Sequence, residues 1–75
     1  MSDYAAWALG FFGRDDQEDA FLLGIYGSAV EAFAAAEVFT GPGCPWIFDG
    51  KGWSTDADFT HQDIVGYYYI GEMVP

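Results

Sequence analysis

Strong negative charge and abundant aromatic side chains occur together in this chain. Its twelve acidic residues face only two basic ones, Arg14 and Lys51, which gives a formal net charge of -10. Yet 52% of the 75 residues are hydrophobic and 20% are aromatic. Disordered acidic segments contain few aromatic residues, because they cannot bury enough apolar surface to offset the entropy lost on folding. The sequence therefore predicts a folded domain with an aromatic core and an acidic surface.

The length of the chain limits this fold to one core. A chain of this size buries only about 60% of its unfolded surface, so we expect a single domain over residues 1–75. Cys44 is the only cysteine, which argues against an internal disulfide framework. The apolar run from Tyr4 to Phe12 follows the acidic Asp3 and is too short to span a bilayer. These features favour a soluble, cytoplasmic protein that does not associate with membranes.

Two apolar runs near the N-terminus have the pattern of β-strands. From Tyr4 to Phe12, the large residues Trp7, Leu9 and Phe11 fall on one face of an extended strand and small residues fall on the other. The segment from Ala20 to Tyr26 is also apolar. The mostly polar residues between the two runs predict a hairpin with an acidic tip.

A capping pattern marks the start of a helix. Ser28 and Glu31 have the S-x-x-E spacing of a capping box, which satisfies free backbone N–H groups at a helix start. The helix is predicted from Ala29 to about Phe39, and Gly41-Pro42-Gly43 ends it. Steps of about 100° per residue place five residues on its inner face. These residues are Ala29, Ala32, Phe33, Ala36 and Phe39.

The C-terminal half alternates strand patterns with turn residues. Trp46-Ile47-Phe48 and Trp53 flank the turn tetrapeptide Asp49-Gly50-Lys51-Gly52, which predicts a second hairpin. Ser54 to Asp63 is expected to form a loop or one helical turn, and Ile64 to Ile70 a closing strand. The resulting order, β-β-α-β-β-β, predicts an α+β fold with one helix packed on one face of a small antiparallel sheet.

One helix cannot cover both faces of this sheet. The last predicted strand places Tyr67 and Tyr69 on the face opposite Tyr68, and the second strand is also apolar on both faces. The uncovered face should therefore pack on a second copy, on a partner, or beneath the segment 54–63. Tyrosine is frequent at binding hot spots, so Tyr67 and Tyr69 are candidate partner-binding residues.

Two groups of carboxylates are further candidates for partner binding. A short acidic run is usually a solubilising loop, but two such groups create self-repulsion that indicates a functional surface. Such a surface attracts basic proteins and repels nucleic acid and anionic membranes. Asp56 and Asp58, if extended, would lie about 6.7 Å apart, close to the rise of about 6.8 Å for two nucleotide steps. The first group is Asp15, Asp16, Glu18 and Asp19, and the second is Asp56, Asp58 and Asp63, with Asp49 nearby.

Metal binding and catalysis find little support in the residue spacing. A calcium loop starting in the second acidic group would need glycine and glutamate where this chain has His61 and Tyr67. The catalytic candidates are Cys44 and a pairing of His61 with Asp58 or Asp63, and these do not suggest a joint nucleophile, base and orienting residue. We therefore expect a non-enzymatic protein without a cofactor or metal.

In size, charge and strand-helix-strand order, the chain resembles a class of small acidic α+β proteins encoded by phages and mobile elements. This class includes anti-CRISPR proteins and other DNA mimics. The resemblance includes no sequence motif. It implies a stoichiometric inhibitor that occupies the basic nucleic-acid-binding surface of a host protein or complex, in the host cytoplasm. The residues that carry the resemblance are Asp15, Asp16, Glu18, Asp19, Asp56 and Asp58.

Three other interpretations remain open. The chain could be a homo-oligomeric or accessory subunit that uses its uncovered aromatic sheet face as an interface. It could come from a high-salt cytoplasm, where acidic surfaces are common. It could also be a small enzyme that depends on His61 and Cys44.

Overall fold

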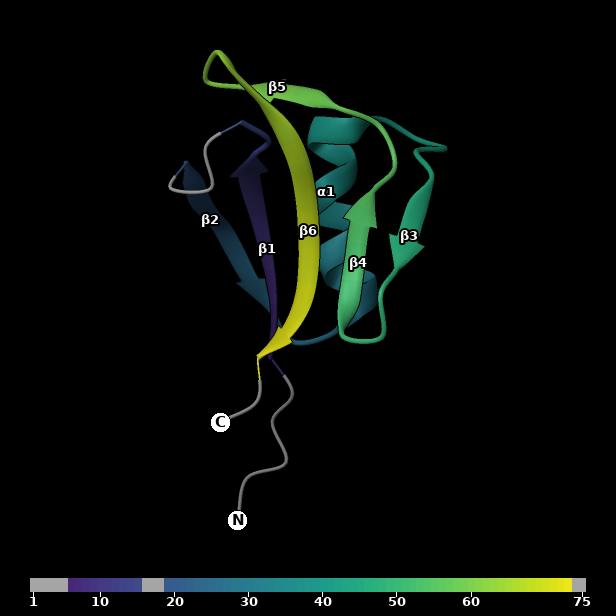
Figure 1. Ribbon diagram of the computed structural model, residues 1–75. Helices are drawn as coiled ribbons and strands as arrows, with labels where there is room; N and C mark the ends of the chain where they lie inside the picture. The colour runs from purple at the N-terminus through teal and green to yellow at the C-terminus, as the bar shows by residue number, and fades with distance from the viewer. Residues whose placement is uncertain (1–5, 16–18, 74–75) are drawn as a thin grey trace.

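A long C-terminal strand forms the centre of the fold. The computed structural model describes residues 6–15 and 19–73. In this part of the chain, β6 pairs with β1 on one side and with β4 on the other, and every strand pairing is antiparallel (Figure 1). The sheet order is β2-β1-β6-β4-β3, and β5 pairs with the start of β6. The strands are β1 (Ala6–Gly13), β2 (Ala20–Tyr26), β3 (Trp46–Phe48), β4 (Gly52–Thr55), β5 (Phe59–His61) and β6 (Ile64–Met73).

The predicted α+β architecture is confirmed. One helix, α1 (Ala29–Thr40), follows the first two strands and lies behind the sheet in the view of Figure 1. The N-terminal strand was predicted from Tyr4. Its described part begins at Ala6, and residues 4 and 5 lie outside the described residues. The second predicted hairpin is present as β3 and β4, with Asp49 to Lys51 connecting them.

The segment from Ser54 to Asp63 differs from the loop or helical turn expected. β4 continues through Thr55, and β5 then pairs with β6 through a tight turn at Gln62 and Asp63, whose φ angles are 51° and 68°. Positive φ at both central residues is the geometry of a hairpin turn. Phe59 and His61 alternate with the exposed Thr60, and both of their rings contact Tyr68. The strand forms because this alternation partly buries the rings of Phe59 and His61 against Tyr68. The segment is mostly polar, so its composition alone does not indicate a strand.

The start of α1 confirms the Ser28 N-cap of the predicted capping box. The Ser28 side-chain oxygen accepts a hydrogen bond from the Glu31 backbone N–H at 3.2 Å. At the other end, Gly41 has φ of 78°, and its N–H donates to the Glu37 carbonyl at 2.8 Å. The helix therefore spans Ala29–Thr40, one residue longer than predicted.

Removal of this cap gives a first prediction. Ser28→Ala should lower the free energy of unfolding by about 1 kcal/mol, because the Glu31 N–H loses its acceptor. Urea unfolding monitored by far-UV circular dichroism measures this change. Ser28→Asn is the matched control, since asparagine also caps helices, and it should remain close to the parent protein. An equal loss in both variants would show that the cap does not stabilise α1.

The core lies between α1 and the sheet. Leu9 and Phe11 of β1 and Ile70 of β6 are fully buried, and Ala32 and Ala36 of α1 are fully buried against them. The two alanines were predicted on the inner face, and their small side chains let the helix backbone approach the strands. These contacts hold β6 in the middle of the sheet, with every second side chain directed away from the helix.

The face of the sheet opposite α1 is not covered by any described element. Leu22, Ile25 and Val65 are exposed by 66%, 54% and 50%. The segment 54–63 does not lie over this face, because the rings of Phe59 and His61 pack on the helix side with Tyr68 and Phe39. Of the three occupants considered for the uncovered face, a second copy and a partner remain. We call this surface the open face.

Candidate protein-binding groove

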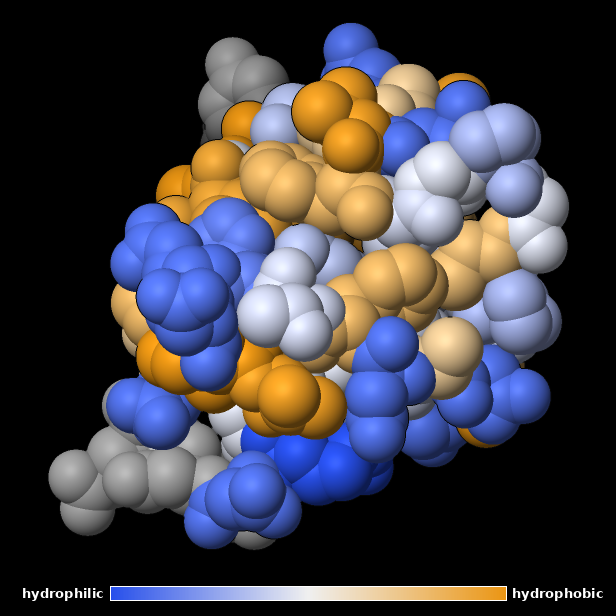
Figure 2. All heavy atoms as spheres, turned by 90° about the horizontal axis from the view of Figure 1, so that it is seen from above, coloured by the Kyte–Doolittle hydropathy of each residue, from blue (hydrophilic) through white to orange (hydrophobic). Residues whose placement is uncertain are grey.

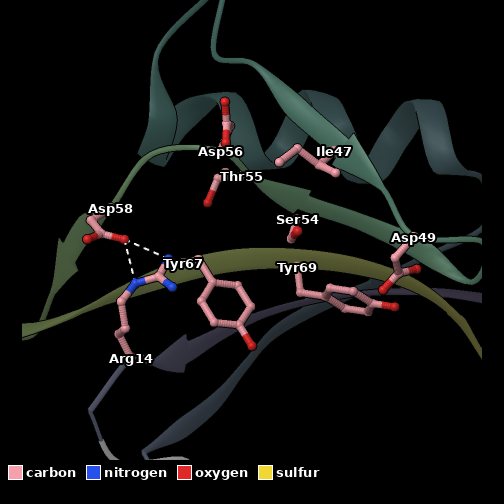
Figure 3. A pocket seen from close by; sticks show the side chains of 9 residues that line it. All are labelled: Arg14, Ile47, Asp49, Ser54, Thr55, Asp56, Asp58, Tyr67 and Tyr69. Carbon is pink, nitrogen blue, oxygen red and sulfur yellow. Dashed lines mark hydrogen bonds and ion pairs between the residues drawn. The ribbon is translucent and has the colours of Figure 1, made fainter.

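A groove of about 680 Å³ lies on the open face, between β6 and the β3–β4 hairpin (Figure 3). Aromatic, carboxylate and hydroxyl side chains line it, together with a single arginine. We call it the acidic groove. Its lining residues are Arg14, Ile47, Asp49, Ser54, Thr55, Asp56, Asp58, Tyr67 and Tyr69.

Two tyrosines form the floor of the acidic groove. Tyr67 and Tyr69 point to the open face because they alternate along β6 with the buried Tyr68. From the neighbouring strand, Phe12 contacts both rings, with centroid separations of 5.8 Å and 6.1 Å. Tyr69 also lies over Gly52, where an added Cβ would come within 2.6 Å of its hydroxyl. The absence of a side chain at Gly52 therefore gives the Tyr69 ring its place in the groove.

Arg14 occupies one end of the groove and is held by two kinds of contact. Its Nε donates a hydrogen bond to Asp58 Oδ1 at 2.6 Å, and its Nη2 lies 2.6 Å from the same oxygen. The guanidinium carbon lies 5.2 Å from the centroid of the Tyr67 ring, a cation–π contact. Both charged side chains are about half exposed, at 49% and 51%, so solvent screens the pair and its contribution to stability is small. The contacts nevertheless show that a carboxylate and a tyrosine ring in this groove can hold a guanidinium.

Asp49 and Tyr69 form a second carboxylate–tyrosine pair further along the groove. Asp49 Oδ1 accepts hydrogen bonds from the backbone N–H groups of Lys51 and Gly52, each at 2.9 Å. These bonds lower the pKa of the Asp49 carboxyl below its ordinary value. Burial, and then the neighbouring Asp49 carboxylate, raise the pKa of Tyr69, so its hydroxyl remains a donor at neutral pH. In the described part of the chain, Asp49 and Asp56 have no ion pair comparable to that of Asp58.

The groove brings together four of the predicted partner-binding residues. Asp56, Asp58, Tyr67 and Tyr69 all line it, and Asp49, named only as a neighbour of the second acidic group, joins them. Asp56 and Asp58 lie in the connection between β4 and β5, so the spacing calculated for an extended segment does not describe them. Sequence reasoning did not identify Ile47 or Ser54 as part of the site.

The remaining predicted site residues lie elsewhere or are not described. Asp63 is in the β5–β6 turn and does not line the groove. Asp15 and Asp19 flank the connection between β1 and β2, while Asp16 and Glu18 lie outside the described residues. Because Gly13 pairs with Gly66, the β1–β2 connection and the β5–β6 turn share one end of the sheet.

That end of the molecule faces the viewer in Figure 2, where hydrophilic residues are interspersed with apolar patches. The hydrophilic surface there is divided into separate areas. Asp15, Asp19 and Asp63 therefore lie at an end of the sheet with a mixed surface. In the acidic groove, by contrast, Asp49 lies beside Tyr69, and Asp58 is paired with Arg14 next to Tyr67.

The surroundings of the two candidate catalytic residues, His61 and Cys44, do not resemble those of a general base and a nucleophile. His61 lies among aromatic rings, with Phe11 and Phe39 at centroid distances of 5.3 Å and 5.6 Å. Its Nδ1 is 3.4 Å from the Tyr68 hydroxyl. Burial raises the pKa of the Cys44 thiol, which keeps it protonated at neutral pH. Within residues 6–15 and 19–73, no three His, Cys, Asp or Glu side chains gather in a way that could hold a metal ion.

No helix in the described part of the chain has the length and apolar character needed to cross a membrane. No protein-family model matches the sequence, and no curated protein or solved structure matches it significantly.

Proposed function

We propose that this chain is an acidic inhibitor that binds the basic nucleic-acid-binding surface of a protein or complex, in the manner of a DNA mimic. The arrangement of Arg14, Asp58 and Tyr67 carries the proposal. It is an internal example of the contact that the partner's arginines would make, with a carboxylate oxygen close to two guanidinium nitrogens and the guanidinium carbon over a tyrosine ring.

The second pair in the groove supplies the binding position for the partner. Asp49 and Tyr69 repeat the combination of carboxylate and ring, and Asp56 lines the same groove. The hydrogen bonds from Lys51 and Gly52 fix the Asp49 carboxylate before any partner arrives, so little side-chain entropy is lost on binding. An arginine from a nucleic-acid-binding surface fits this position because it normally contacts a phosphate, another anionic oxygen acceptor.

The overall charge supports the same function. A net charge of -10 on 75 residues attracts a basic surface over long range and increases the association rate at low salt. The same charge repels the phosphates of nucleic acid, so the chain should compete with nucleic acid for a partner and should not bind it directly.

A charge-matched comparison tests whether the groove carries recognition. The probe is a synthetic peptide of alternating arginine and glycine, titrated by calorimetry in 50 mM salt. The double variant Asp49→Asn with Asp56→Asn should bind about tenfold more weakly, about 1.4 kcal/mol, because two groove carboxylates become neutral. Asn at position 49 keeps the side-chain oxygen that accepts the turn hydrogen bonds.

The control removes the same two charges outside the groove. Asp15→Asn with Asp63→Asn should change the affinity by less than about twofold, since neither residue lines the groove. Asparagine tolerates the positive φ of position 63, so the turn should be retained. Equal weakening by both double variants would mean that net charge alone drives binding. Unchanged binding by the groove variant would remove the groove from the proposal.

Competition with DNA tests the mimicry itself. Duplex DNA should displace the protein from the same arginine peptide, and binding should weaken steeply between 50 and 200 mM salt. Direct association of the protein with the duplex in the absence of peptide would contradict a mimic.

A further inference from the structure

The edge strand β2 is long, apolar and unprotected. None of its seven residues, Ala20–Tyr26, is charged or a proline. Natural sheets usually protect their edges with charges, prolines or very short strands, because an open edge can pair with another strand. The opposite edge strand of this sheet, β3, has three residues and lies between Pro45 and Asp49. Only β2 therefore offers a long edge for strand pairing in the described part of the sheet.

A bulge gives β2 a symmetric pattern of buried and exposed side chains. Leu9 pairs with Gly24 and Gly10 pairs with Leu22, so Leu23 is an extra residue in β2. As a result, Leu23 and Gly24 are both partly buried, whereas Leu22 and Ile25 are exposed on the open face. From residue 21 to residue 26 the order is inward, outward, inward, inward, outward, inward. This order reads the same in both directions.

We propose that β2 pairs antiparallel with β2 of a second copy, and that Leu22 of each copy lies opposite Ile25 of the other. Directly opposed residues in an antiparallel pair point to the same face of the sheet. In only one register do all opposed residues between 21 and 26 point to the same face. In that register the two-fold axis passes between Leu23 and Gly24. The bulge thus selects one register, and the interface is isologous, as in most homodimers.

The charge distribution favours a second copy over a basic partner at this edge. Within β2 itself, residues 20–26 include no carboxylate, so a lysine or arginine opposite these residues would have no charged partner on the strand. In the paired arrangement the two acidic grooves lie six strand spacings apart, or about 29 Å at about 4.8 Å each. The Debye length at physiological salt is about 8 Å, so the repulsion between the grooves is largely screened. The carboxylates of the two acidic grooves are thereby kept apart.

Sedimentation of the full chain over a range of concentrations tests the proposal. The parent protein should form a dimer, and Leu22→Lys should raise the dimer dissociation constant at least tenfold because lysine would lie beside the apolar Ile25 of the other copy. Val38→Lys is the matched control, since Val38 is 82% exposed on α1 and the charge change is the same. Dimerisation of Val38→Lys should match that of the parent. A monomer at every concentration, or equal dimerisation of both variants, would overturn the proposal.

Disulfide cross-linking tests the register in a Cys44→Ser background. A protein carrying both Leu22→Cys and Ile25→Cys should form an intermolecular disulfide under mild oxidation, since opposed residues have Cα atoms about 4.5–5.5 Å apart. Leu22→Cys alone should cross-link at least tenfold more slowly, because its sulfur faces Ile25 of the other copy. Equal rates for the two proteins would contradict this register.

Discussion

Phe11→Ala should leave a substantial fraction of the protein unfolded at 37 °C. Phe11 is fully buried, and its ring contacts Tyr68 at 5.0 Å, His61 at 5.3 Å and Phe21 at 6.3 Å. Truncation of a buried phenylalanine costs about 3–5 kcal/mol, because it removes apolar contacts and leaves a cavity. Small domains have a total stability at the low end of about 5–15 kcal/mol, so this loss approaches the whole. Urea unfolding at 25 °C, followed by tryptophan fluorescence, measures the change.

Phe48→Ala provides the control for Phe11→Ala. Phe48 is 57% exposed on the edge strand β3 and contacts the Trp53 ring at 4.9 Å. Its loss should cost less than about 1 kcal/mol, since much of its surface is already in water. Comparable destabilisation by the two substitutions would place the core elsewhere.

Gly66→Ala should destabilise the protein by about 3 kcal/mol even though it adds only one methyl group. Gly66 is buried in β6, and a Cβ there would overlap the Phe12 carbonyl oxygen and lie 2.8 Å from the Phe11 ring. The carbonyl belongs to the paired strand β1, so it cannot move without disturbing the β1–β6 pairing. The same urea experiment measures the loss, and a reduced slope would indicate a less ordered native state.

Gly27→Ala separates this steric effect from a general effect of replacing glycine. A Cβ at Gly27 would meet only the Glu31 carboxylate oxygen, at 3.3 Å, and that side chain can move. Its stability should therefore stay within about 0.5 kcal/mol of the parent. If Gly66→Ala is equally mild, the close approach of β1 and β6 is not required for the fold.

The two proposed interaction surfaces lie on different parts of the sheet, so their tests are independent. The acidic groove lies at β6, β4 and β3, whereas the proposed dimer uses the opposite edge strand β2. Leu22→Lys should therefore affect dimerisation and leave arginine-peptide binding per groove within about twofold, and the groove variants should show the reverse. A dimer would present two acidic grooves to a basic partner, which would increase the effective affinity through avidity.

The candidate site could be predicted only in part. Tyr67 and Tyr69 were identified because strand alternation separates them from Tyr68, and Asp56 and Asp58 because they belong to an acidic group. The ion pair between Arg14 and Asp58 joins residues 44 positions apart, and no pattern within either segment indicates it. Arg14 is next to the acidic tip in sequence, and it pairs with Asp58 of the second group.

The features that the sequence alone determined arise from local interactions. They are the capped helix, the alternating faces of β1 and β6, and a sheet face that one helix cannot cover. A capping hydrogen bond spans three residues and strand alternation spans two, so both leave a visible pattern. Only the tertiary structure decided that β6 lies between β1 and β4, that the segment before it forms β5, and that Asp49 joins Asp56 and Asp58. These features arise from pairing and packing between distant segments. Their energy depends on how well whole surfaces fit, and no short stretch of residues records that fit.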